Sequence, residues 1–247
     1  IPGAFEIAVA QFKAIPKMVS AFRTGLGLGW HEHDSALFHG TERFFRPGYA
    51  ANLVTQWIPA CDGLHDKLTA GATVADVGCG HGASTLIMAA AFPRSNFVGF
   101  DYHVPSVEQA TQAAERAGLA ARVRFEVASA KGFPGRGYDL VTMFDCLHDM
   151  SHPQAVMRAI RRATRPDGVW LICDIKARDS YEENVKKNPM ATMMYGASVL
   201  TCMSSAMSEP HGAGLGTLGF SENVARRMCS EAGFTRSDAA GELRRSV

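Results

Sequence analysis

The chain has 247 residues, of which 47% are hydrophobic and 20% are charged, and 25 basic side chains offset 24 acidic ones to a net charge of +1. This is the composition of an ordinary globular protein that buries a full core, and no apolar run approaches the ~20 residues that span a bilayer. The balanced charge gives no sign of a nucleic-acid partner, because nucleic-acid-binding proteins usually carry a basic excess or stripe.

The first 70 residues are predicted to form an N-terminal helical region. Apolar side chains recur at helical spacing over residues 4–28, and Pro16 within this stretch predicts a kink or a break. Residues 30–48 are polar and are expected to be irregular, and a second helical stretch runs from Tyr49 to Leu68.

From residue 73 the pattern changes to short apolar strands that alternate with helices. The predicted strands cover residues 73–77, 96–101, 122–127, 138–144 and 169–175, and the helices between them cover residues 83–92, 104–117 and 153–164. This alternation indicates right-handed βαβ units and a parallel sheet. Such sheets bind ligands at the carboxyl ends of their strands.

A helical insertion is expected at about residues 177–219, where the alternation stops. The insertion is rich in methionine and ends in a glycine-rich run, which indicates a flexible loop. A last helix is predicted over residues 221–232, with Ser221 as its N-cap and Gly233 as its stop. The short polar tail after Phe234 does not have the pattern of closing strands, so we expect segments of the protein to be missing at both ends of this sequence.

The most informative motif is Asp76-Val-Gly-Cys-Gly-His-Gly82, which follows a strand and opens a helix. Glycines in such a loop allow a sharp turn and the close approach of a ligand where a Cβ would clash. Asp101 ends the next strand, where a carboxylate accepts both hydroxyl protons of a ribose.

Two cofactor classes fit this layout. Gly78, Gly80 and Ala83 satisfy the dinucleotide fingerprint, so a nicotinamide-dependent oxidoreductase remains an alternative. Three features favour S-adenosylmethionine. Asp76 suits a cationic amino-acid group and would repel a pyrophosphate, the three glycines are spaced as G-x-G-x-G, and no tyrosine is followed four residues later by lysine.

The segment 74–82 resembles motif I of class I S-adenosylmethionine-dependent methyltransferases, and the segment 97–101 resembles motif II. The resemblance covers about residues 70–176. It implies an α/β, Rossmann-like, doubly wound and mostly parallel sheet of seven strands, in a methyltransferase domain at 71–247. The N-terminal helices and the insertion would form a lid. S-adenosylmethionine would be the cofactor and S-adenosylhomocysteine the product.

The same resemblance assigns positions around the methionine part of the cofactor. The loop Gly78-Cys79-Gly80-His81-Gly82 would run beneath it. Asp76 would contact its amino group directly or through water, and Asp145 would close the pocket near the sulfonium.

Other positions match the adenosine part. Asp101 would bind the ribose hydroxyls, and Tyr102 would lie along the adenine. Ser129 and Ala130 would face the adenine edge, although many family members carry an acidic residue there.

The acceptor of the methyl group is expected to be a small aromatic or apolar molecule, methylated most readily at oxygen. Leu147-His148-Asp149 resembles a segment of small-molecule O-methyltransferases in which the matching histidine is the general base, and we assign that role to His148, with a purely structural histidine as the alternative. The pocket would be formed by residues 1–70 and the insertion. Its candidate lining residues are Met193, Met194, Tyr195, Met203, Met207 and His211.

No metal site is predicted. His31, His33 and Asp34 have the spacing of alternate loop ligands, but the sequence near them offers no further ligands. The six cysteines form no C-x-x-C pair, and their wide spacing is typical of free thiols in a reducing, cytoplasmic environment.

The N-terminal helices, residues 145–150 and the insertion are similar to bacterial methyltransferases that carry an N-terminal winged-helix domain, which is absent from this chain. A homodimer formed through that missing domain is therefore possible. The resemblance also leaves open a non-catalytic S-adenosylmethionine-binding regulator. We expect a small-molecule partner, no membrane and no nucleic acid bound by this chain.

Overall fold

The computed structural model describes residues 2–236, and its centre is a sheet of five parallel strands. The strands are β1 (Thr73–Val77), β2 (Asn96–Asp101), β3 (Val123–Val127), β4 (Tyr138–Phe144) and β5 (Thr164–Cys173), in the order β3-β2-β1-β4-β5. The predicted α/β class and parallel sheet are confirmed, and five of the seven expected strands lie within the described residues. Nearly every residue of β1 and β4 is buried, as helices on both faces of a parallel sheet require.

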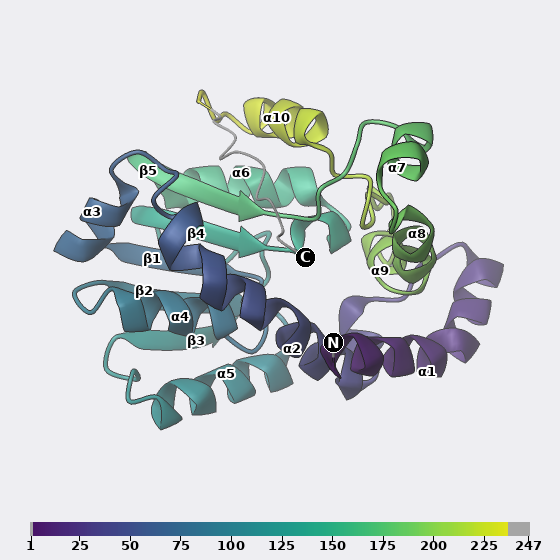
Figure 1. Cartoon of the computed structure of the whole chain (residues 1–247), viewed down its shortest axis with the longest axis horizontal. Helices are drawn as coiled ribbons and strands as arrows, with labels where there is room; N and C mark the ends of the chain where they lie inside the picture. The colour runs from purple at the N-terminus through teal and green to yellow at the C-terminus, as the bar shows by residue number, and fades with distance from the viewer. Residues whose placement is uncertain (1, 237–247) are drawn as a thin grey trace.

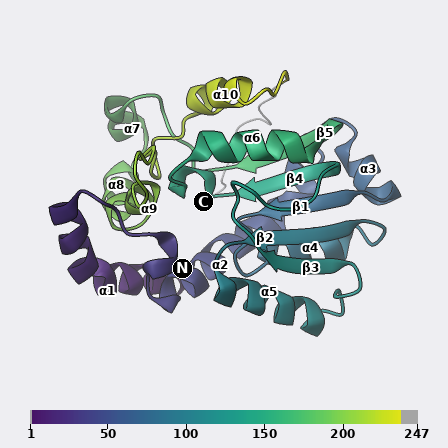
Figure 2. The same cartoon turned by 180° about the vertical axis from the view of Figure 1, so that it is seen from behind.

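Helices cover both faces of the sheet (Figures 1 and 2). One face packs against α6 (Pro153–Ala163) and α10 (Glu222–Glu231), in a core that contains Phe100 and Met143. The opposite core unites sheet residues with η2 (Leu53–Trp57), α3 (Leu64–Ala70) and α4 (Ala83–Ala91). A further helix, α5 (Val104–Arg116), connects β2 to β3. The C-terminal half of the N-terminal region therefore shares the core of the sheet.

Two predicted boundaries were wrong. The segment 30–48 is largely helical, because α2 (Ser35–Asn52) is capped by Asp34, whose carboxylate accepts a hydrogen bond from the N–H of Ala36. The strand β5 begins at Thr164, directly after α6, and the turn-like residues 165–168 form an irregularity between the pairs Tyr138–Thr164 and Leu140–Val169.

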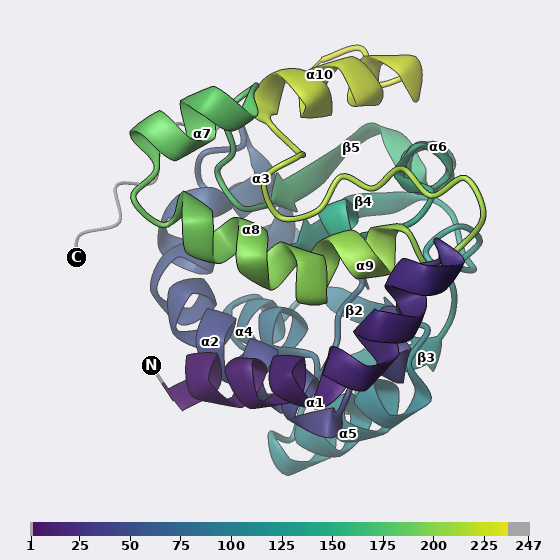
Figure 3. The same cartoon turned by 90° about the vertical axis from the view of Figure 1, so that its right-hand side faces the viewer.

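The first helix and the insertion together cover the carboxyl edge of the sheet (Figure 3). The insertion contains α7 (Tyr181–Lys187), α8 (Ala191–Leu200) and α9 (Cys202–Ala206). The N–H of Leu28 donates to Ser204 Oγ at 2.7 Å, and that of Gly27 donates to the carbonyl of Met207 at 2.9 Å. These bonds fasten the end of α1 (Pro2–Thr24) to α9.

The helix α1 bends along its length and leaves an apolar face uncovered. It contains Pro16, and two views show that its axis changes direction, as the sequence predicted (Figures 1 and 3). Phe5, Phe12 and Phe22 are each 69% to 74% exposed on this helix. Exposed apolar faces mark interaction sites, and the homodimer stays a prediction. In the part of the chain that the structure describes, no helix is long and apolar enough to cross a membrane.

Candidate active site

The loop between β1 and α4 folds over the end of β2. The N–H groups of Gly78 and Cys79 donate to the carbonyl of Phe100 at 2.8 and 3.1 Å, and the N–H of Gly80 donates to Asp101 Oδ2 at 2.9 Å. These bonds place the glycine loop and Asp101, which lie 21 residues apart in sequence, in one structural unit.

Two positions of this loop require glycine for different physical reasons. Gly82 has φ +78°, and a Cβ there would lie 2.5 Å from Cζ of the Phe125 ring, so the loop can rest on the core only without a side chain. Gly80 has φ +52°, and a Cβ there would meet nothing within 4 Å. The backbone at Gly80 therefore borders open space, which is where a ligand can approach.

Asp76 is buried beneath the loop, with 1% of its surface exposed. Its Oδ2 accepts hydrogen bonds from Ser84 Oγ at 2.7 Å and Thr85 Oγ1 at 2.6 Å, and its Oδ1 accepts one from Thr142 Oγ1 at 2.9 Å. Burial raises the pKa of Asp76, and the three hydroxyl donors oppose that shift. The contact between Asp76 and the amino group of the cofactor, direct or through water, stays a prediction.

We expect Thr142→Val to destabilise the fold by about 1–3 kcal/mol, because the change leaves Asp76 Oδ1 buried without its hydroxyl donor. The measurement is the midpoint and slope of urea unfolding. Thr111→Val is the matched control. Its hydroxyl donates only to the carbonyl of Val107 in α5, and an exposed substitution of this kind usually changes stability by less than about 0.5 kcal/mol. Equal unfolding midpoints for the two variants would contradict a structural role for the Asp76 cluster.

The end of β2 is fixed by the N-terminal region. Asp101 also accepts the N–H of His103 on Oδ1 at 2.9 Å, and burial raises its pKa against the two backbone donors. The Tyr102 hydroxyl accepts the N–H of His31 at 3.2 Å, and its ring meets the His31 ring edge-on at 5.5 Å. Phe38 stacks on His103 with centroids 4.1 Å apart. Tyr102 nevertheless remains 47% exposed, so a face of it is open to a ligand.

The positions predicted to face an adenine edge lie after β3. Ser129 is exposed and its Oγ accepts the N–H of Lys131 at 3.3 Å, whereas Ala130 packs partly against the core. Neither side chain presents a buried polar group, so neither assignment gains geometric support.

Carboxylates gather at the carboxyl edge of the sheet. Four strands each end at or near an acidic residue, and these residues are Asp76, Asp101, Asp145 and Asp174. Side chains of one sign around a low-dielectric cleft focus a field that attracts the opposite charge. This edge is therefore suited to a cationic ligand and is unsuited to a pyrophosphate.

Asp145 adopts an uncommon backbone conformation for a residue other than glycine, with φ +50°. Its N–H donates to the carbonyl of Cys173 at 2.8 Å, and its Oδ2 accepts the hydroxyl of Tyr49 at 3.0 Å. Burial raises the pKa of Tyr49, so the phenol stays protonated and donates. Strained residues of this kind cluster at functional sites, and Tyr49 was not anticipated from the sequence.

The imidazole of His148 is held between two carboxylates. It lies in η3 (Leu147–Asp149), is 3% exposed, and places Nδ1 at 2.6 Å from Asp174 Oδ1 and Nε2 at 3.1 Å from Asp149 Oδ1. Burial lowers the pKa of His148, but the charges of Asp149 and Asp174 outweigh it, and the net pKa lies well above the usual value. The two carboxylates favour the protonated ring, so a general base at His148 must first lose a proton.

The predicted acceptor-lining residues do not converge on one cavity. Met193, Met207 and His211 are exposed, and His211 has φ +60°. The Met194 sulfur accepts Asn188 Nδ2 at 3.3 Å, and the Tyr195 hydroxyl accepts Asn184 Nδ2 at 3.1 Å. Met203 packs beneath the glycine-rich segment, where Cβ atoms on Gly214 or Gly216 would meet its side chain within 3.5 Å.

His33, a candidate metal ligand from its spacing in the sequence, is a buried side chain. It is 7% exposed, neither ring nitrogen has a hydrogen-bond partner, and burial lowers its pKa to about 4. Asp149 lies close enough for its charge to affect that pKa. Asp34, considered with it as a metal ligand, instead caps α2 and pairs with Lys13 at 2.9 Å.

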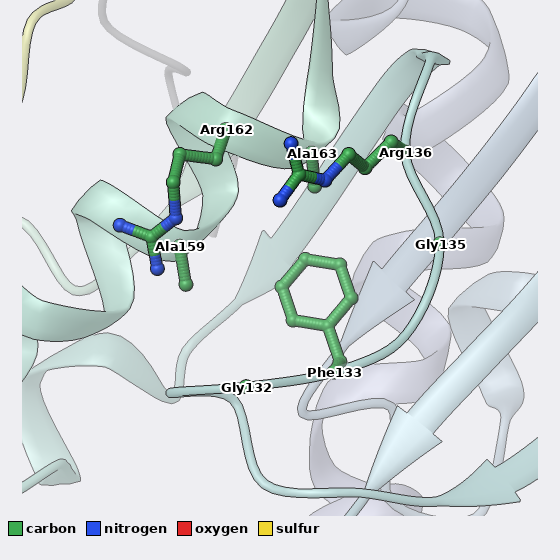
Figure 4. Close-up of a pocket in the computed structure, with 7 residues that line it drawn as sticks. All are labelled: Gly132, Phe133, Gly135, Arg136, Ala159, Arg162 and Ala163. Carbon is green, nitrogen blue, oxygen red and sulfur yellow. The ribbon is translucent and has the colours of Figure 1, made fainter.

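A surface pocket lies away from this edge, between the β3–β4 loop and α6 (Figure 4). Phe133 forms its floor, with Arg136 and Arg162 beside it. A second hollow, between α7 and the segment before α10, includes Tyr195. Neither contains the glycine loop, Asp101 or His148.

Comparisons with known proteins find methyltransferases. Residues 68–233 match a family model described as a methyltransferase domain. The chain is 34% identical over 109 residues to 27-O-demethylrifamycin SV methyltransferase of Amycolatopsis mediterranei, covering 43% of this chain and 40% of that protein. It is 31% identical over 136 residues to the ubiquinone biosynthesis O-methyltransferase of Paraburkholderia phytofirmans, covering 51% of this chain and 52% of that protein.

The fold is shared with solved structures at lower identity. An O-methyltransferase family protein from Burkholderia thailandensis superposes with a TM-score of 0.66 and 17% identity, covering 94% of this chain and 67% of that one. The matches to the curated relatives span about a third to half of their lengths.

Proposed function

The chain belongs to the class I S-adenosylmethionine-dependent methyltransferases, and from that premise we propose that it methylates a small aromatic or apolar acceptor at an oxygen atom. The observation that carries the proposal is the pair His148–Asp174 beside the carboxylate-lined edge of the sheet. Of the two relatives above, one is named as a methyltransferase of 27-O-demethylrifamycin SV, and the other is named as an O-methyltransferase of ubiquinone biosynthesis. Family membership sets aside the nicotinamide-dependent alternative.

The residues at this edge fit the cofactor. The open backbone at Gly80 leaves room beside the loop, and the surrounding carboxylates suit a cation. Asp101 would hold the ribose, and Tyr102 would lie along the adenine. Asp145 would lie near the sulfonium, and Asp76 would keep the loop in place. When bound, S-adenosylmethionine supplies an electrophilic methyl group.

The protein contributes orientation and proton transfer. Alignment of two reactants in a displacement is worth up to roughly 7–11 kcal/mol of the barrier. Asp174 Oδ1 also accepts the N–H of Ile175 at 2.7 Å, so this carboxylate is fixed and holds Nδ1 of His148. Nε2 would then accept the hydroxyl proton of the acceptor once Asp149 moves aside. A positive charge nearby disfavours the charged imidazole, so a bound sulfonium favours the neutral ring.

The test is a screen with isotopically labelled methyl donor against phenols, catechols and alcohols, with amines and thiols as comparison classes. We expect label in a phenol or catechol product, identified as a methyl ether by mass spectrometry. Transfer confined to nitrogen acceptors, or to protein or nucleic acid, would contradict the proposal. The same samples are titrated with S-adenosylhomocysteine as a control, because the absence of methyl transfer is informative about acceptors only when the cofactor site is functional.

A further inference from the structure

Metal-ligating side chains from separate parts of the sequence meet beside the sheet edge. His148 and Asp149 lie in η3, and Cys202 begins α9. One ligand atom from each residue lies within 4.8 Å of the other two, and this is the one group of three such residues found within 2–236. Cys202 lies far from His148 and Asp149 in the sequence, so the spacing of ligands along the chain does not predict this cluster.

The spacing of two of these ligands suits a shared ion. Nε2 of His148 and Oδ1 of Asp149 form an ion pair at 3.1 Å, but their orientation is not that of a hydrogen bond. Zinc bonds to nitrogen and oxygen are about 2.0–2.1 Å, so a tetrahedral ion separates neighbouring N and O ligands by about 3.3 Å. The observed separation is therefore close to that of two ligands on one ion.

A supporting carboxylate is already in place behind the histidine. Asp174 Oδ1 lies 2.6 Å from Nδ1 of His148 and accepts the N–H of Ile175. Metal-binding histidines almost always donate their second N–H to a carboxylate or carbonyl, which fixes the ring and directs the other nitrogen at the metal. Here that other nitrogen is Nε2, on the side of Asp149.

The cluster also has negative charge that the described side chains do not balance. Two largely buried carboxylates, Asp149 and Asp174, share the single imidazole of His148 as an ion-pair partner, and Asp174 Oδ2 accepts no hydrogen bond from the residues within 2–236. Buried charge that is only partly balanced is costly, and a cation removes that cost. A thiol, an imidazole and a carboxylate together favour a zinc-class ion over magnesium or calcium, which prefer oxygen ligands alone.

We propose that His148, Asp149 and Cys202 bind one zinc-class divalent ion, with Asp174 orienting His148. On binding, the Cys202 thiol and Nε2 of His148 each release a proton to solvent, and the thiolate and the freed Nε2 lone pair then bind the metal. The consequence for catalysis rests on the proposed function. A general base whose lone pair is bound to metal cannot accept a proton, so the ion inhibits methyl transfer.

The experiment uses tag-free, chelator-treated full chain titrated with Co²⁺ alone, followed by absorption spectroscopy, and with Zn²⁺ alone, followed by calorimetry. We expect one ion per chain and a thiolate-to-cobalt charge-transfer band. Cys202→Ser should lose the band and weaken binding at least tenfold. Cys61→Ser, which changes a half-buried thiol that donates to the carbonyl of Trp57 at 3.7 Å, is the matched control and should retain both.

Absence of stoichiometric binding by the wild type, or equal binding by the two cysteine variants, would overturn the site. Inhibition is then measured with the acceptor found in the screen, as the ratio of rates with and without Zn²⁺ for each variant. Activation by Zn²⁺ would refute the inhibitory role. Binding of S-adenosylhomocysteine by the same metal-free samples reports on the proposed function separately, so failure of one proposal does not imply failure of the other.

Discussion

Asp101→Ala is expected to remove measurable binding of S-adenosylhomocysteine while the chain stays folded. If the Asp101 carboxylate holds both ribose hydroxyls, two hydrogen bonds to a charged group are lost, each worth about 1.5–3 kcal/mol. At 1.4 kcal/mol per tenfold, the dissociation constant should rise roughly 100-fold or more. The loss of affinity should exceed the sum of the two hydrogen bonds to the ribose. The reason is that the same carboxylate also accepts the N–H of Gly80 and holds the glycine loop.

Calorimetric titration with S-adenosylhomocysteine measures this change, and titration with NAD tests the other cofactor class. Asp101→Asn separates the two roles of the side chain, because the amide keeps one oxygen acceptor but loses the charge. Asp66→Ala on α3 is the matched control, since that carboxylate is exposed and α3 precedes β1, whereas the loop follows the opposite end of that strand. Binding by Asp101→Ala equal to that of the control would show that the ribose is held elsewhere.

Features that depend only on residues close together in the sequence were predictable. The strand, the glycine loop and the following helix are encoded within about thirty residues, so their order and the carboxyl-edge position of Asp101 follow from periodicity and glycine spacing. The bend of α1, a helix that contains Pro16, is local in the same sense, because a proline removes a backbone donor wherever the helix lies.

Residues that act through tertiary contacts were not predictable in this way. Asp174 is 26 residues from His148, and their 2.6 Å contact exists only because β4 and β5 are neighbours in the sheet. Cys202 reaches the same place through the packing of α9 on η3. The enclosure of Asp76 by three hydroxyls also depends on the β1–β4 pairing, which a single sequence does not specify.

His148→Gln is expected to lower kcat for an oxygen acceptor by about 10²–10⁴, the usual worth of positioned acid–base catalysis, with binding of S-adenosylhomocysteine unchanged. Glutamine keeps a polar side chain of similar reach but offers no basic nitrogen. Turnover is measured on chelator-treated enzyme, so that metal at the cluster does not lower the wild-type rate. His65→Gln on α3 is the control, because its ring is half exposed. Unchanged turnover in His148→Gln would show that His148 is not the general base and has only a structural role.

Asp174→Asn decides whether His148 is positioned as a base or is simply packed. The amide can still contact Nδ1, but it no longer stabilises the imidazolium that forms when Nε2 accepts the acceptor's proton. A positioning role therefore predicts a lower kcat with little change in KM or in cofactor affinity, and a smaller effect than His148→Gln. A role confined to packing predicts instead a lower unfolding midpoint with normal turnover by the folded fraction. The two readouts move independently, so the pair of variants assigns the proton transfer to this side chain or removes it.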